Sequence, residues 1–240
     1  MNWLVPAAWA GAVVAGGVMA WAVRAPRSTL LAPSVWQGPR NRKALALTFD
    51  DGPSESTPEL LSLLAEHQAK ATFFVIGTNV ERLPEVARQI VAAGHDIGNH
   101  TYTHSPLYLR HAQFIADELG LCQQAIWNAT GVAADYFRPP YGCRWFGLRS
   151  AQQAYQLQGI MWSAIGLDWK LSGAAIAPRL RKAARNGAIL CLHDGRERRQ
   201  QPDIRSTLEA ARVLLPQLRA EGYDLVTISD LLCPTQHSNA

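Results

Sequence analysis

Cysteine is scarce in this sequence, and the few cysteines that are present lie far apart. The four residues are Cys122, Cys143, Cys191 and Cys233, and no two of them form a C-x-x-C pair. Because structural zinc–thiolate sites use such closely spaced cysteines, the spacing argues against one. We expect free, buried thiols, with a single disulfide as the alternative.

Charged residues are also sparse, at 18% of the chain, and the net charge is only +4. The basic residues are scattered, apart from Arg196-Glu197-Arg198-Arg199, which we interpret as an exposed loop. Proteins that bind nucleic acid usually carry a basic stripe, so nucleic acid is not an expected partner. The apolar content of 48% indicates a globular protein with a sizeable core, which we expect to be a monomer.

The N-terminal region lacks charge altogether from Trp3 to Val23. A helix of this length reaches about 30 Å, the thickness of a bilayer core, so residues 1–24 are predicted to be a membrane anchor. A cleavable signal peptide is the alternative, because Ala20-Trp21-Ala22 has the small-x-small form of a cleavage site. Residues 25–42, which contain several prolines, are predicted to be a tether.

Beyond the tether, short apolar strands alternate with amphipathic helices. Strands are predicted at residues 44–47, 71–76, 160–163, 188–192 and 224–228, and helices at 57–66, 84–93 and 113–129. This alternation is typical of a parallel sheet covered by helices, either open or closed into a barrel. In both forms the active site lies at the carboxyl ends of the strands.

The first such strand ends in two adjacent carboxylates, Asp50 and Asp51, followed by a Gly52-Pro53 turn. Neighbouring strand residues point to opposite faces, but a strand that breaks at Gly52 can direct both acids to one site. Two close carboxylates repel each other unless a cation lies beside them. The pair therefore indicates a metal site or an acid/base site, and a solvated turn is the alternative.

A second signal is the histidine pair His100 and His104. Two histidines four residues apart lie on one face of a helical turn, so both imidazoles can reach one ion. With Asp51 they form a set of two histidines and one carboxylate that leaves coordination positions open, which is typical of a catalytic metal. Zinc fits such a set, and cobalt, nickel and manganese remain open.

Three further segments carry polar residues at turns or strand ends. Arg138 begins the stiff turn Arg138-Pro139-Pro140-Tyr141-Gly142, and Asp168-Trp169 follows an apolar segment. A buried strand ends at His193, and the period of two places Cys191 on the same face as His193. Arginine offers planar pairing to a carboxylate, although an ordinary surface turn is the alternative for that segment.

Taken in order, these five segments resemble the polysaccharide deacetylase family, also called carbohydrate esterase family four. The resemblance covers roughly residues 43 to 232 and implies a distorted parallel (β/α) barrel that forms a single catalytic domain, residues 43–235. The family includes deacetylases of chitooligosaccharides and of peptidoglycan N-acetylglucosamine. The resemblance therefore implies a metal-dependent hydrolase that removes N-acetyl groups from amino sugars in a polysaccharide or oligosaccharide and releases acetate.

The resemblance also assigns roles to individual residues. It makes Asp50 the general base and makes Asp51, His100 and His104 the ligands of a divalent metal ion. Arg138 matches the residue that holds the base, and His193 matches the general acid, oriented by Asp168. Tyr141 matches the residue whose backbone N–H binds the oxyanion, and Trp169 and Cys191 match the wall of the acyl pocket.

Two positions depart from the family pattern, and the substrate stays open. Ile165 stands where the family often has Asp, and Cys191 stands where Leu is usual, so the pocket is expected to be wider or more polar. A deformylase or deacetylase of a lipid-linked sugar, which an anchor would suit, is one alternative. A non-catalytic carbohydrate-binding relative is another.

The residues that flank the apolar run bear on which side of a membrane the domain lies. Basic residues follow it, from Arg24 to Lys43, and none precedes it. The positive-inside rule then favours a membrane-anchored domain on the cytoplasmic side, whereas the family resemblance favours the outer side, where cell-wall deacetylases act.

Overall fold

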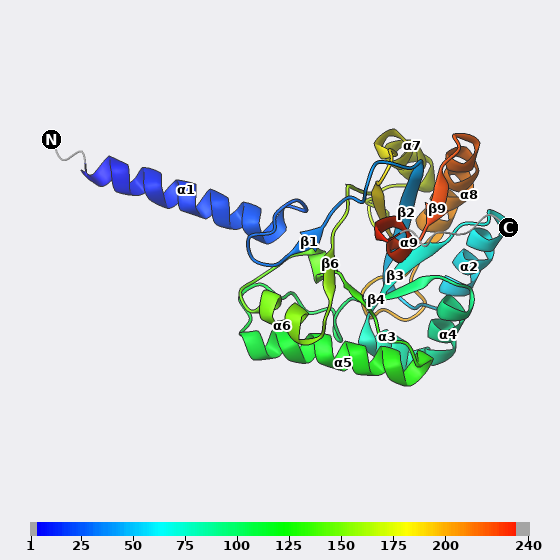
Figure 1. Cartoon of the computed structure of the whole chain (residues 1–240), viewed down its shortest axis with the longest axis horizontal. Coiled ribbons are helices and arrows are strands. Elements are labelled where there is room, and N and C mark those ends of the chain that lie inside the picture. The colour runs from blue at the N-terminus through cyan, green and yellow to red at the C-terminus, as the bar shows by residue number, and fades with distance from the viewer. Residues whose placement is uncertain (1–3, 234–240) are drawn as a thin grey trace.

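The computed structural model describes the backbone of residues 4–233 and the side chains of residues 14–233. One nine-stranded sheet organises the molecule, with strand order β1-β6-β5-β4-β3-β2-β8-β7 and β9 beside β2 (Figure 1). The strands are β1 Ser34–Val35, β2 Ala44–Gly52, β3 Ala71–Val75, β4 Asp96–Asn99, β5 Tyr136–Phe137, β6 Gln158–Ile160, β7 Ala164–Ile165, β8 Ile189–His193 and β9 Asp224–Val226.

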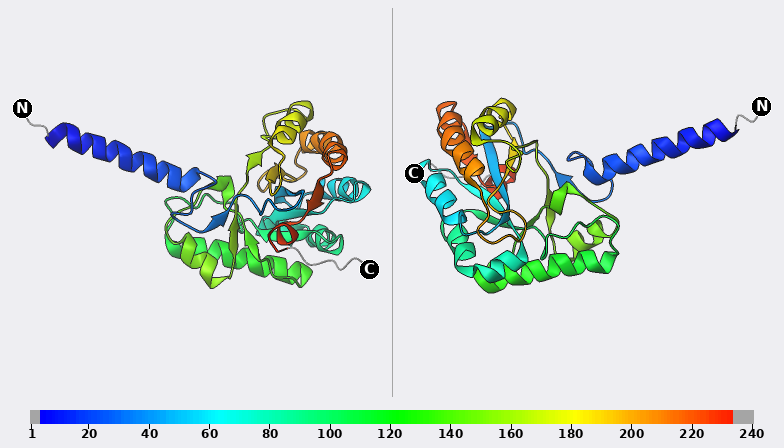
Figure 2. Two further views of the ribbon diagram at one scale, coloured as in Figure 1. Left: turned by 45° about the horizontal axis from the view of Figure 1, so that its top comes forward. Right: turned by 180° about the vertical axis from the view of Figure 1, so that it is seen from behind.

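Helices cover the outer face of this sheet (Figure 2). In chain order the helices of the protein are α1 Leu4–Arg24, which extends away from the sheet, α2 Thr57–Glu66, α3 Gly77–Arg82, α4 Pro84–Ala92, α5 Ala112–Thr130, the 3-10 turn η1 Pro140–Gly142, α6 Leu148–Ala154, α7 Gly173–Ala183, α8 Arg205–Ala220 and α9 Ile228–Leu232. All ladders between these strands are parallel. The predicted distorted parallel (β/α) barrel is therefore confirmed, in an incomplete, half-barrel form.

The central strand β2 shows why the sheet curves. Its larger side chains, Leu45, Leu47 and Phe49, belong to the main core beneath the helices, whereas Ala44 and Ala46 face the other way. Small residues on the inner face leave room for a strongly curved sheet, whose interior is narrow. The same alternation places Asp50 on the inner face, at the carboxyl end of the strand.

Most predicted elements appear close to their expected positions, but several short ones were missed. The helices at 57–66, 84–93 and 113–129 correspond to α2, α4 and α5, whereas the strand predicted at 160–163 ends at Ile160 as part of β6. Strands β1, β4, β5 and β7 have four residues or fewer and are too short to show a clear pattern of alternation. Cys122, Cys143 and Cys191 are free and buried, and Cys233 is free and exposed.

The N-terminal helix α1 extends away from the barrel, and its carboxyl end lies against the domain (Figures 1 and 2). Among the residues that the structure describes, no helix is both long and apolar enough to span a bilayer. The predicted membrane anchor at residues 1–24, and the membrane-anchored location based on it, are therefore wrong. Much of α1 is alanine and glycine, whose small side chains offer little apolar surface.

The segment predicted to be a tether, residues 25–42, packs against the barrel. Strand β1 pairs with β6 at Val35 and Ile160, and Ala32 is fully buried. The Gly38 N–H donates to the Gly187 carbonyl at 2.8 Å. This segment is thus part of the folded domain, which begins before residue 43. Residues 1–3 of the predicted anchor and 234–235 of the predicted domain lie outside the described residues.

Candidate active site

The carboxyl end of β2 brings both adjacent acids to one place. Asp51 has a left-handed backbone with φ of 73°, and the pairing register with β3 shifts between Asp50 and Gly52. This bulge reverses the usual alternation, so Asp50 and Asp51 both line the same cavity. The turn was predicted at Gly52, but the unusual backbone lies one residue earlier, at a cost that folded proteins tolerate mainly at functional sites.

The turn after Asp51 is held from below by Asp194, which is fully buried. The Thr57 hydroxyl donates to Asp194 Oδ2 at 2.6 Å, and burial raises the pKa of Asp194 to about 7. A Cβ atom at Gly52 would lie 2.2 Å from Asp194 Oδ2, so glycine is needed for this close approach. Asp194 was not among the predicted site residues, although it directly follows His193.

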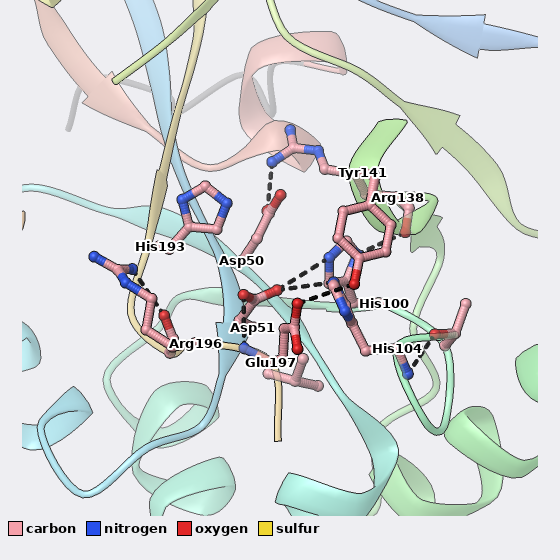
Figure 3. Close-up of polar contacts among 12 residues, drawn as sticks. Asp50, Asp51, His100, His104, Arg138, Tyr141, His193, Arg196 and Glu197 are labelled. Atoms are coloured by element: carbon pink, nitrogen blue, oxygen red, sulfur yellow. Dashed lines mark hydrogen bonds and ion pairs between the residues drawn. The ribbon is translucent and has the colours of Figure 1, made fainter. Parts of the chain in front are cut away.

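The predicted ligand set of Asp51, His100 and His104 converges, with its three ligand atoms within 4.8 Å of one another (Figure 3). Asp51 Oδ1 lies 3.1 Å from His104 Nε2 and 3.4 Å from His100 Nε2. The residues between the histidines are irregular rather than helical, so the predicted helical turn is wrong. Instead the loop curls, with left-handed Thr101 and His104.

The chemistry of this set fits a divalent cation. His100 Nδ1 lies 2.7 Å from the Arg138 carbonyl, which only a protonated Nδ1 can satisfy, so in the neutral ring Nε2 carries the lone pair. That lone pair faces the Asp51 carboxylate, and two acceptors at this separation need a cation between them. Burial acts to raise the pKa of Asp51, but the facing rings of His100 and His104, which donate to the carboxylate in their protonated form, outweigh it and hold the pKa well below its usual range.

Asp50 is held by a buried guanidinium. Arg138 is fully buried, and its Nη1 donates to Asp50 Oδ1 at 2.6 Å and to the Thr48 hydroxyl at 2.7 Å. Its other nitrogens donate to the carbonyls of Ile160 and Met161, both at 3.1 Å. Because these contacts fix the guanidinium, they also orient the Asp50 carboxylate that is paired with it.

His193 is paired with Asp168 on the other side of the cavity. His193 Nδ1 lies 2.8 Å from Asp168 Oδ1, and the His193 N–H donates to Asp168 Oδ2 at 2.9 Å. The Thr207 hydroxyl donates to the same oxygen at 2.6 Å. Burial lowers the pKa of His193, but the bond and charge of Asp168, with Asp51 and Asp50 nearby, raise it to about 9. His193 is therefore protonated at neutral pH and can act as an acid.

The Asp168→Asn variant is expected to move the alkaline limit of activity to lower pH by more than one unit. A group with a raised pKa is protonated below that pKa, so an acid function of His193 is lost as the pH rises through about 9. Asparagine removes the charge of Asp168, and burial then lowers the pKa of the imidazole. The measurement is kcat against pH, and an alkaline limit unchanged from the unaltered protein would contradict the pairing.

A cavity of about 860 Å³ joins these groups, and Tyr141 and Trp169 lie on its rim with about half of each side chain exposed. Tyr141 has a left-handed backbone, with φ of 56°, and its hydroxyl lies 2.9 Å from Glu197 Oε1. The Glu197 N–H donates to Asp51 Oδ2 at 2.9 Å. The segment 196–199, predicted to be an exposed loop, therefore helps to build the site. Its position just after His193 in the sequence could have indicated this role.

Cys191 does not line this cavity, contrary to the predicted pocket wall. It is fully buried beneath the site, where its Sγ lies 3.5 Å from Asp50 Oδ2 and 3.6 Å from Arg138 Nη1. Its partner in the β7–β8 ladder, Ile165, lines the cavity instead. Cys191 faces the same side of β8 as His193, but it lies earlier in the strand and therefore below the level of the pocket.

The chain is similar in sequence to known deacetylases. The family model for polysaccharide deacetylase matches residues 37–160. A peptidoglycan-N-acetylglucosamine deacetylase of Bacillus cereus is 37% identical over 202 residues, which are 82% of this chain and 92% of that protein. A chitooligosaccharide deacetylase of Bradyrhizobium sp. is 36% identical over 198 residues, 79% of this chain and 90% of that protein.

A solved structure shows the same likeness in three dimensions. The crystal structure of the Bc1960 peptidoglycan N-acetylglucosamine deacetylase matches with a TM-score of 0.78 and 29% identity, covering 83% of this chain and 92% of that one.

Proposed function

The chain belongs to the polysaccharide deacetylase family, and we propose that it is a hydrolase that removes the N-acetyl group from N-acetylglucosamine residues of a polysaccharide or oligosaccharide. The products are acetate and a free amino sugar. The substrates named for its relatives, peptidoglycan and chitooligosaccharides, define the range to be tested.

One observation carries this proposal. Asp50 and His193 are register partners at the ends of the adjacent parallel strands β2 and β8, so a base and an acid stand side by side. Each has its own partner of opposite charge, Arg138 for Asp50 and Asp168 for His193. Such a pair of groups, each held by its own charged partner, suits hydrolysis of an amide, in which one group takes a proton and the other gives one.

The roles of the residues follow from their positions. Asp51, His100 and His104 would hold the divalent ion, for which two imidazoles and one carboxylate favour zinc over harder ions. When bound, the ion supplies Lewis-acid polarisation of the amide carbonyl and lowers the pKa of water. Asp50 takes the proton of the attacking water, and His193 gives a proton to the departing amine nitrogen, which cannot leave as an anion.

The remaining residues of the site orient the substrate. We assign to the Tyr141 N–H a hydrogen bond to the oxygen on which negative charge develops. Trp169 and Ile165, both on the cavity wall, would contact the acyl methyl group. In this assignment Ile165, and not Cys191, forms the wall of the acyl pocket together with Trp169.

Release of acetate from N-acetylated glycans is the test of this function. Acetate and formate would be measured with chitooligosaccharides, peptidoglycan fragments and a lipid-linked amino sugar as substrates. We expect acetate from one of the two glycans. Formate from the lipid-linked sugar alone would favour the alternative function, and no product from any substrate would refute the hydrolase.

Removal of divalent metal is expected to abolish this activity. Chelation followed by return of zinc, cobalt, nickel or manganese should restore it, because Asp50 alone cannot activate water sufficiently at neutral pH. The measurements are metal content per chain and initial rate. A chain with full activity and no bound metal would contradict the assignment of Asp51, His100 and His104.

A further inference from the structure

A second cavity of about 360 Å³ adjoins the catalytic one. Trp162 and Ile165 line both cavities, so the two cavities lie next to each other on either side of these side chains. The outer wall of the second cavity comes from the N-terminal segment, through Trp21, Arg27 and Trp36. A volume above about 300 Å³ is within the range of small-molecule sites.

The N-terminal wall of this cavity is rigidly attached to the barrel. Arg144 is fully buried, and its guanidinium donates to the carbonyls of Ala25 and Ser28, the latter at 2.6 Å. Its backbone N–H donates to the Val23 carbonyl at 3.0 Å. The Met161 N–H, next to Trp162, donates to the Val35 carbonyl at 2.6 Å. The segment thus presents Trp21 and Trp36 at a defined place beside the active site.

The chemistry of the second cavity differs from that of the first. Three indole rings, those of Trp21, Trp36 and Trp162, line it, and the guanidinium of Arg27 lies 4.4 Å from the centre of the Trp36 ring. Its other charged lining residue is Arg179, and the lining includes no acidic side chain. The catalytic cavity, in contrast, contains the carboxylates of Asp50, Asp51 and Asp168.

This combination defines the ligand. Indole rings provide flat apolar surfaces for the C–H faces of a sugar ring, and their N–H groups can reach its hydroxyls. Arginines without neighbouring acids attract a carboxylate and can bind it through two hydrogen bonds. Because the cavity lies next to the catalytic one, a glycan chain with one sugar in the catalytic cavity can place a neighbouring sugar here.

We propose that the N-terminal segment forms a second sugar subsite, which binds a neighbouring carboxylate-bearing sugar of the same glycan chain. The inference rests on the proposed function and narrows its substrate to an acidic N-acetylated glycan, such as peptidoglycan fragments, over neutral chitooligosaccharides. The segment from Trp21 to Trp36 is then a part of the substrate groove.

Binding to the full-length chain tests this subsite separately from turnover. Calorimetry would compare a carboxylate-bearing peptidoglycan tetrasaccharide, the same glycan with its carboxylates amidated, neutral chitotetraose and a disaccharide too short to reach the subsite. Trp36→Ala is expected to weaken binding of the acidic tetrasaccharide by about tenfold, the usual scale for an aromatic or arginine anchor. The ratio of tetrasaccharide to disaccharide affinity should fall by a similar factor.

The Arg27→Gln variant tests the contribution of positive charge to binding separately from that of the indole rings. This variant is expected to lower the affinity for the acidic tetrasaccharide by about tenfold and the affinity for the amidated form much less. The matched controls are Trp127→Ala, an exposed tryptophan on α5, and Arg212→Gln, which pairs with Glu59 outside both cavities. Both controls should bind all four ligands as the unaltered protein does.

The outcomes that overturn the inference are distinct from those that overturn the function. Unchanged tetrasaccharide binding in both Trp36→Ala and Trp21→Ala would remove the subsite, even if the protein deacetylates glycans. An equal effect of Arg27→Gln on the binding of acidic and amidated glycans would contradict the proposed preference of the subsite for a carboxylate. Failure to release acetate from any glycan would refute the proposed function, while the binding comparison would still decide the subsite.

Discussion

Asp50→Asn is expected to lower the rate of deacetylation by a factor of about 10²–10⁴, the range for loss of a general base, while metal content per chain stays unchanged. Asparagine keeps the shape of the side chain and an oxygen that can accept from Arg138, whose Nη1 lies 2.6 Å from Asp50 Oδ1. It cannot take a proton from water. Alanine is a poorer probe, because an unpaired buried guanidinium costs about 3–5 kcal/mol.

Two further variants identify the cause of that loss. Asp51→Asn should lose metal as well as activity, since Asp51 faces both histidines. Asp117→Asn, on the outer helix α5, is the matched control and should keep the rate of the unaltered protein. The measurements are kcat, metal content by elemental analysis and thermal unfolding. A nearly normal rate for Asp50→Asn with metal bound would show that another group takes the proton.

His193→Ala is expected to slow amide substrates by about 10²–10⁴, the range for loss of a general acid, and to slow an aryl acetate ester much less. An amine leaves only when it is protonated, whereas an activated phenolate leaves without help. His193 is the group for this proton transfer because Asp168, 2.8 Å from its Nδ1, holds it in the charged form.

The comparison of the two substrates is the decisive measurement. His67→Ala, at the end of α2 and outside both cavities, is the control for loss of a histidine and should leave both rates unchanged. Equal losses on amide and ester for His193→Ala would mean that His193 binds the substrate or the transition state and does not protonate the leaving group.

The sequence was sufficient for those features that depend on neighbours along the chain. The short apolar run at residues 44–47 predicted the first part of β2, and the leucines of residues 57–66 predicted α2 with the same bounds. The five polar segments were also visible, because each follows directly on a strand or a stiff turn. Their resemblance to one family, together with the rule that strand ends share one edge of a sheet, gave the order and identity of the site residues.

Tertiary structure decided which side chains meet and which way they face. Arg138 reaches Asp50 across 88 residues of sequence, and β7 carries Ile165 rather than Cys191 to the cavity wall. The left-handed backbones of Asp51 and His104 are imposed by the surrounding contacts, since their own preferences disfavour them.

The N-terminal segment shows most clearly the difference between what the sequence predicts and what the tertiary structure decides. From the sequence its apolar residues and prolines indicated an anchor and a tether, because composition alone cannot show what covers a surface. In the folded chain, buried Arg144 and the pairing of β1 with β6 hold this segment on the barrel. Long-range packing, which no local pattern records, places Trp21 and Trp36 beside the active site.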